Sequence, residues 1–127
     1  MTQTKKQEIG SWGEEQAVLF LINAGYVILD RNWQCKNREE LDIIAEKEIP
    51  PFGKTLIFVE VKTREKNDGN AERATRGEKL KHMQKAAHVY CMKKKIDIER
   101  TPIQFEQVSV YGTENRPRIQ QYEIPIE

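Results

Sequence analysis

The sequence predicts an α/β fold in which a mixed β-sheet is flanked by helices. Apolar residues recur at helical spacing in two segments, 4–24 and 77–94. Largely apolar runs bounded by turn-forming residues predict four strands, at 26–32, 40–46, 55–63 and 102–111. The resulting order of helix, three strands, helix and strand favours one sheet with helices packed against it.

Length and composition favour a single globular domain spanning residues 1–127. The chain has 127 residues, 38% of them hydrophobic and 32% charged, which suits one domain with its own core. No apolar run approaches the roughly 20 residues of a membrane span, and the polar N-terminus does not resemble a secretory signal. Cys35 and Cys91 lack metal-ligand spacing. We therefore expect a cytoplasmic protein with reduced thiols and no membrane contact.

Glu14, in the first helical segment, is the first candidate functional residue. It lies one turn before Ala17, at the edge of the apolar face of the helix. Gly10 and Gly13 flank it, although glycine inside a helix is unfavourable by roughly 1 kcal/mol relative to alanine. Small residues there would leave room for another backbone or a ligand beside Glu14. The alternative is that residues 4–10 form a frayed helix start.

The two central strands predict a hairpin that brings two acids together. Segments 40–46 and 55–63 flank a predicted loop at 47–54, which contains two prolines and a glycine. In an antiparallel hairpin the numbers of paired residues sum to a constant, here near 101 or 102, and Asp42 and Glu60 sum to 102. Directly opposed side chains have their β-carbons roughly 5 Å apart. The two carboxylates can therefore share one ion.

Glu60 and Lys62 interrupt a strand that is otherwise apolar. They are two residues apart, so their side chains point to the same face of the sheet. Burying an ionised group without a partner is costly. One interpretation is a structural ion pair inside the sheet. The matching position of Asp42 on the neighbouring strand favours a shared functional site instead.

Two acids and a lysine on neighbouring strands suit a magnesium site. Mg²⁺ prefers oxygen ligands and often takes one or two carboxylates together with waters and a substrate phosphate. Asp42 and Glu60 fit that role, and the main-chain carbonyl of Val61 and the carboxylate of Glu14 could complete the shell. Lys62 could hold or deprotonate the attacking water, or neutralise charge on the phosphate. The sequence thus predicts phosphodiester hydrolysis with Mg²⁺, or with Mn²⁺ in its place.

The net charge of +1 conceals an uneven distribution. Residues 39–60 carry six acids and two bases, a balance of −4, whereas residues 73–95 carry eight bases and one acid, a balance of +7. A basic segment beside an acidic site suits a nucleic-acid partner, most simply DNA, although a solvated helix face is the alternative. The predicted phosphate contacts are Arg64, Arg73, Arg76, Lys79 and Lys85.

The fourth strand, 102–111, does not keep one alternation throughout. Ile103 and Phe105 share one parity, whereas Val108 and Val110 share the other. A β-bulge near Glu106–Gln107 would explain this shift. Residues 118–126 predict a last edge strand, which Pro117 and Pro125 limit.

Asp42, followed after a loop by Glu60-Val61-Lys62, resembles the PD-(D/E)XK nuclease superfamily. The sequence is also similar, over about residues 9–110, to the YraN family of small bacterial proteins. The segments that carry this similarity are Gly13-Glu14, 25–33, 40–45 and 59–64, with Lys79, Ala86-Ala87 and Tyr90 at the spacing of that family.

The resemblance implies a restriction-endonuclease-like core, with a layout similar to that of archaeal Holliday-junction resolvases. It implies that Glu14, Asp42 and Glu60 form the acidic site and that Lys62 is the catalytic lysine. The chain departs from the family pattern at Glu39, where glycine is usual, and at 104–106, where Gln-Phe-Glu replaces Arg-Phe-Asp. These departures bear on metal binding and on phosphate contact by the fourth strand.

Three functions are compatible with these patterns. The first is a metal-dependent endonuclease that hydrolyses phosphodiesters in structured or branched DNA. Cleavage of a symmetric four-way junction needs two active sites, so a homodimer suits this function. The second is a nucleic-acid-binding module that keeps the fold without turnover. The third is a scaffold of a DNA-processing complex, which docks its partner through an exposed sheet edge.

Overall fold

The computed structural model describes residues 3–35, 39–64, 77–112 and 117–126. Within these ranges the chain forms, in order, α1 (Lys5–Asn23), β1 (Val27–Gln34), β2 (Glu40–Ile49), β3 (Gly53–Arg64), α2 (Glu78–Lys93), β4 (Ile103–Tyr111) and β5 (Arg118–Ile124). The predicted α/β class is confirmed, and the arrangement is consistent with a restriction-endonuclease-like core. Neither described helix is long and apolar enough to cross a membrane.

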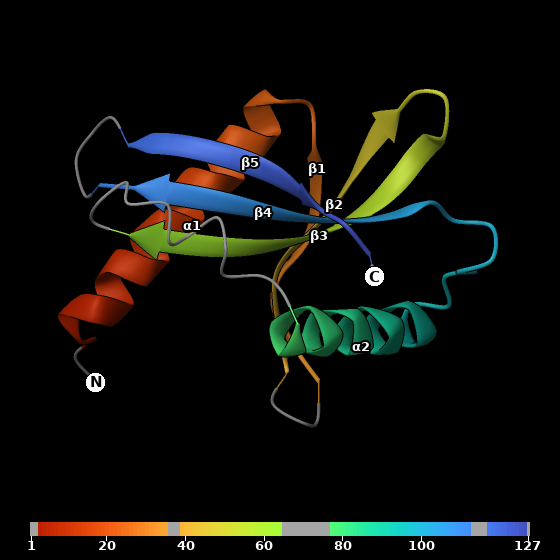
Figure 1. The fold of residues 1–127 in the computed structure, drawn as a ribbon, viewed down its shortest axis with the longest axis horizontal. Coiled ribbons are helices and arrows are strands. Elements are labelled where there is room, and N and C mark those ends of the chain that lie inside the picture. The colour runs from red at the N-terminus through yellow and green to blue at the C-terminus, as the bar shows by residue number, and fades with distance from the viewer. Residues whose placement is uncertain (1–2, 36–38, 65–76, 113–116, 127) are drawn as a thin grey trace.

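The five strands form one mixed sheet in the order β1-β2-β3-β4-β5 (Figure 1). Neighbouring strands run antiparallel except for β3 and β4, which are parallel. Parallel neighbours need a crossover connection, and α2 lies within the one between them. The last strand, predicted at 118–126, is the edge strand β5 and ends at Ile124.

The hairpin of β2 and β3 has the predicted register. Ile43 pairs with Val59 and Ile44 with Phe58, so the residue numbers sum to 102. The predicted loop at 47–54 is wrong in its extent, because the ladder continues to the end of β2 and leaves only a short turn. Proline and glycine mark this turn but do not prevent the residues beside them from pairing.

The predicted bulge near Glu106–Gln107 is wrong. β4 pairs with β3 without interruption from Ile103 to Tyr111. The apparent shift arises because each face of β4 changes character halfway along. The face with Phe105 becomes polar at Gln107 and Ser109, whereas the opposite face is polar at Glu106 and then apolar. The irregularity of this sheet lies instead in β1, between Ile28 and Asp30.

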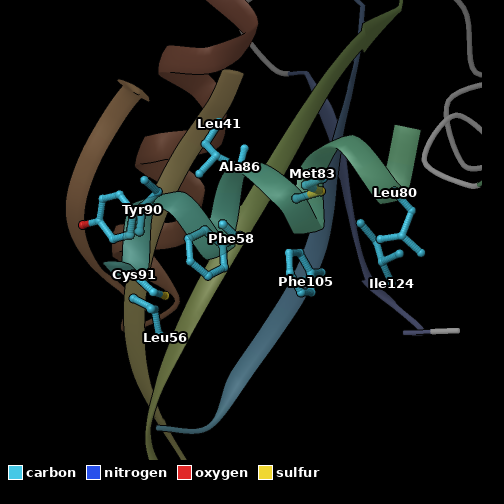
Figure 2. Close-up of a cluster of buried hydrophobic side chains, with 12 residues drawn as sticks. Leu41, Leu56, Phe58, Leu80, Met83, Ala86, Tyr90, Cys91, Phe105 and Ile124 are labelled. Carbon is cyan, nitrogen blue, oxygen red and sulfur yellow. The ribbon is translucent and has the colours of Figure 1, made fainter. Parts of the chain in front are cut away.

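Two apolar clusters lie on opposite faces of the sheet, one under each helix. Under α2, the rings of Phe58 and Phe105 stack with centroids 5.5 Å apart, and Tyr90 meets Phe58 edge-on at 5.8 Å (Figure 2). Under α1, Ala17 and Leu21 are fully buried. Burying a large apolar side chain stabilises by roughly 1.5–3 kcal/mol. These clusters hold both helices against strands that also carry the acidic residues.

Candidate active site

Asp42 and Glu60 lie next to each other just beyond the last paired residues of β2 and β3. The last backbone pair is Ile43 with Val59, and the next positions in this register are Asp42 and Glu60. Beyond that pair, the main-chain N–H of Val61 donates a 2.8 Å hydrogen bond to Oδ2 of Asp42. The carboxylate of Asp42 thus accepts a hydrogen bond from a main-chain N–H that would otherwise pair with the backbone of the neighbouring strand. The hairpin register therefore fixes Asp42 beside Glu60.

The environment of Asp42 opposes its ionisation. Burial is the main cause and the charge of Glu60 the second, and together they raise the pKa of Asp42 to about 7. Hydrogen bonding to Glu60 and the charge of Glu14 act in the same direction, while the N–H of Val61 acts against them. Like charges at close range disfavour the ionised form. The ionised form of Asp42 is therefore unfavourable, and a bound cation would relieve that cost.

Two lysines neutralise the buried carboxylate of Glu60. Glu60 is only 5% exposed, and its Oε1 lies 3.2 Å from Nζ of Lys62 and 3.2 Å from Nζ of Lys79. Lys62 comes from the same face of β3, as predicted, whereas Lys79 reaches over from the first turn of α2. A buried charge needs such partners. Lys79, proposed from the sequence as a phosphate contact, is thus part of the acidic centre.

Glu14 enters the site from α1 and is held by two residues of β1. Its Oε1 accepts hydrogen bonds from Nδ2 of Asn32 at 2.9 Å and from Nη2 of Arg31 at 3.2 Å. Asn32 has a φ of 50°, in the left-handed region that asparagine tolerates better than most residues. Arg31 and Asn32 were not identified from the sequence, because only the packing of α1 on β1 brings them to Glu14.

Gly13 allows α1 to approach the sheet closely enough to present Glu14. A β-carbon at residue 13 would lie 1.9 Å from Oγ1 of Thr63. A close approach beside Glu14 is therefore confirmed at Gly13, but the neighbour is the side chain of Thr63 and not the backbone or ligand that was expected. At Gly10 an added β-carbon would meet nothing within 4 Å. The alternative of a frayed start is not seen, since Thr4 caps the helix through reciprocal hydrogen bonds with Gln7.

A groove of about 1280 Å³ opens between the first half of α1 and the strands β1 to β3. It contains Asp42, Val61 and Lys62 of the predicted site, and Glu14 lies on its α1 side. Its further lining residues are Gln3, Lys5, Lys6, Gln7, Ile9, Gly10, Ser11, Glu15, Arg31, Asn32, Glu40, Thr63 and Arg64.

Glu60 borders a second, smaller cavity instead. This cavity has a volume of about 500 Å³ and also contains Lys79 and His82 of α2. Asp42 and Lys62 therefore lie between the groove and the carboxylate of Glu60. Asp42 and Lys62 thus face the groove, whereas Glu60 faces the cavity beside α2.

The remaining predicted phosphate contacts have different outcomes. Arg64 is exposed and lines the groove. Lys85 is exposed on α2 and lines neither cavity. Arg73 and Arg76 lie outside the described residues. Among the described lysines and arginines of the basic segment 73–95, only Lys79 lines either of these two cavities.

The two departures from the family pattern fall in different places. Glu39 borders the second cavity, with its Oε1 3.2 Å from Nδ1 of His82. Glu106 lies on the α1 face, is 3% exposed and accepts a 2.8 Å hydrogen bond from the hydroxyl of Tyr26. Nε2 of Gln104 donates to Glu106 as well, at 2.6 Å. The change at 104–106 therefore builds a buried network away from the acidic centre.

The donor set fits a hard divalent cation with two protein carboxylates. Among the described residues there is no group of three or more acidic, histidine or cysteine side chains that could hold a metal. Asp42 and Glu60 would supply the one or two carboxylates that Mg²⁺ usually takes together with several waters and substrate phosphate. Ligation by Glu14 and by the carbonyl of Val61 stays a prediction.

Comparison with known proteins places the chain in a family. The model of "Uncharacterised protein family UPF0102" matches residues 13–110, a span that includes Glu14, Asp42 and the segment 60–62. The chain belongs to the UPF0102 family. This is the YraN family that the sequence resembles.

Relatives in the UPF0102 family align with most of this chain. The UPF0102 protein of Phocaeicola vulgatus is 37% identical over 83% of this chain and 80% of its own length. That of Caldicellulosiruptor saccharolyticus is 39% identical over 84% of each chain, and that of Flavobacterium psychrophilum is 34% identical over 91% of each. The family is described without an activity, so the chemistry must come from the site itself.

Proposed function

We propose that this protein is a divalent-cation-dependent endonuclease that hydrolyses phosphodiesters in structured or branched DNA. The observation that carries the proposal is the contact of Asp42 with Glu60 and with the N–H of Val61, beside Lys62 and open to a groove. Carboxylates placed next to an ammonium group are suited to holding a cation and a phosphate together. The restriction-endonuclease-like arrangement of the chain supports a nuclease further.

Each residue has a distinct role in this proposal. Asp42 and Glu60 would hold Mg²⁺ or Mn²⁺, which supplies positive charge to the phosphate in the transition state. Lys62 borders the groove, so its ammonium group would orient the attacking water or stabilise charge on the phosphate. Lys79 would hold Glu60 in place from the side of α2. Arg31 and Asn32 would keep Glu14 beside the groove.

A DNA-binding module without turnover is the second candidate. The contacts of Glu60 favour it, because two ammonium groups already neutralise this carboxylate. Such a module would bind DNA with a strong salt dependence, would be insensitive to chelators and would release no product. The endonuclease and the binding module therefore differ in one measurable property, the cation-dependent appearance of product.

The test is a panel of end-labelled linear, flap and four-way DNA substrates with Mg²⁺, Mn²⁺ or a chelator. We expect cleavage of at least one branched substrate with either cation, and rates reduced by roughly 100-fold or more in Asp42→Asn and Lys62→Ala. Lys54→Ala is the matched control, since this lysine is 71% exposed at the start of β3.

Two outcomes would overturn the endonuclease. One is the absence of product from every substrate under all cation conditions. The other is undiminished cleavage by Asp42→Asn or Lys62→Ala. Size-exclusion chromatography of the active fraction with a four-way junction tests the homodimer, which a symmetric pair of cuts requires.

A further inference from the structure

The basic residues of the groove fall into a paired and an unpaired set. Nη2 of Arg31 lies 2.6 Å from Oε1 of Glu15 and 3.2 Å from Oε1 of Glu14, and Nζ of Lys62 lies 3.2 Å from Glu60. These two cations are therefore already neutralised by acids. Within the described ranges, three basic residues of the groove form no ion pair: Lys5, Lys6 and Arg64.

The unpaired lysines extend the groove away from the carboxylates. Lys5 and Lys6 lie in the first turn of α1, and the side of the groove formed by this helix runs from Gln3 to Glu15. In Figure 1 the first turns of α1 project past the C-terminal end of β3. Lys5 and Glu14 are nine positions apart, which corresponds to roughly 13 Å of helix. That length spans about four nucleotides of a stacked strand, at 3.4 Å per nucleotide.

The lysines of α2 do not extend the groove as those of α1 do. Its lysines Lys81 and Lys85 are exposed, but they line neither the groove nor the second cavity. The groove that holds Asp42 and Lys62 is thus lined by lysines of α1 and by none of the described lysines of α2. Nucleic-acid contact by residues 73–95, inferred from charge composition, stays a prediction, and Arg73 and Arg76 lie outside the described residues.

We propose that the first turn of α1, through Lys5 and Lys6, binds the phosphate backbone of DNA on one side of the scissile phosphate, and that Arg64 binds it near the end of β3. This inference rests on the proposed function for the position of the scissile phosphate. The contacts are to phosphates, so they confer affinity and register but no base preference. The groove between them carries the acidic centre.

The experiment measures DNA binding without cleavage. A fluorescein-labelled flap DNA is titrated in chelator with the full chain and its variants, and anisotropy is recorded from about 50 to 200 mM salt. The test variant is Lys5→Glu/Lys6→Glu. Acidic residues in the first turn are favourable for a helix, so this charge reversal does not threaten α1.

Two further charge reversals complete the comparison. The rival variant is Lys81→Glu/Lys85→Glu on α2. The matched control is Lys54→Glu/Arg100→Glu, whose side chains are 71% and 89% exposed. Lys54 is ten residues before Arg64 in the same strand, or about 33 Å. Circular dichroism of all variants verifies the fold.

We expect Lys5→Glu/Lys6→Glu to weaken binding by roughly 10-fold or more and to reduce the salt slope by about 1.5 to 2. The α2 and control variants should change affinity by less than the α1 variant. Unchanged affinity in the α1 variant, or a larger loss in the α2 variant, overturns the inference. Because the chelator removes divalent cations, this result is independent of cleavage. DNA binding that depends on α1 without any nuclease activity would remove the proposed function and leave the DNA contact standing.

Discussion

The main-chain N–H of Val61 donates a 2.8 Å hydrogen bond to Oδ2 of Asp42. This bond helps to hold Asp42 next to Glu60 although their charges repel, with Asp42 partly and Glu60 almost fully removed from water. The pKa of Asp42 rises to about 7 as a result. The folded state therefore carries an electrostatic cost at neutral pH that a proton or a cation relieves.

The electrostatic cost of ionised Asp42 in the folded state predicts that Asp42→Asn stabilises the protein at high pH. The ordinary pKa of this carboxyl group is 3.8, so between about pH 4 and 7 the unfolded chain releases its proton first and the folded state is progressively destabilised. We expect the variant to match the wild type near pH 4 and to exceed it by roughly 2–4 kcal/mol at pH 8. Urea unfolding in chelator measures the difference, with Glu48→Gln as an exposed control. Parallel stability curves would contradict this assignment.

Lys62 and Lys79 are predicted to differ in their effect on cleavage. Both contact Oε1 of Glu60 at 3.2 Å, but only Lys62 borders the groove. Lys62→Ala should therefore lower the cleavage rate by roughly 100-fold or more, whereas Lys79→Ala should lower it by about 10-fold or less. Single-turnover kinetics on a cleaved DNA substrate provide the comparison. Equal losses would mean that both lysines act only by neutralising Glu60.

The close contact of Gly13 with Thr63 predicts opposite effects at two neighbouring glycines. Gly13→Ala places a β-carbon 1.9 Å from Oγ1 of Thr63 and should destabilise by roughly 1–3 kcal/mol. Gly10→Ala meets nothing within 4 Å and should stabilise by roughly 0.5–1 kcal/mol. Thermal and urea unfolding report both values. A further Thr63→Ala change should recover part of the loss at Gly13, and a lack of recovery would show that the backbone itself obstructs the new side chain.

Asn32 is predicted to position Glu14 through its side-chain amide. Asn32→Gly keeps the φ of 50° accessible but removes the 2.9 Å hydrogen bond to Oε1 of Glu14, whereas Asn32→Ala also strains the backbone. We expect both variants to lose cleavage activity to a similar extent and only Asn32→Ala to lose about 1 kcal/mol more in stability. Activity that follows stability across the two variants would assign Asn32 a structural role alone.

Sequence reasoning succeeded where the structure follows local rules. The hairpin sum of 102 located Asp42 opposite Glu60 because the register of an antiparallel pair propagates along both strands. Alternation placed Lys62 on the same face as Glu60, and the two groups form an ion pair. The family resemblance is confirmed by the match over residues 13–110.

Other features depend on how distant segments pack. Arg31 and Asn32 meet Glu14 across 17 and 18 positions of sequence, and nothing in a strand pattern specifies that contact. The false bulge in β4 came from assuming that a face stays apolar along a whole strand, whereas this face turns polar at Gln107 beside Glu60. The change of character is itself a sign of a site, because buried polar residues need a reason to be there.

The most direct test of the central claim is the uptake of Mn²⁺ by the protein at pH 8, followed by electron paramagnetic resonance of the free ion. The wild type should bind one Mn²⁺ with a dissociation constant below about 1 mM, Asp42→Asn and Glu60→Gln should each weaken it by roughly 10-fold or more, and Glu40→Gln, in the same groove, should not. Equal binding by the wild type and Asp42→Asn, or no uptake by the wild type, would contradict a cation site formed by Asp42 and Glu60.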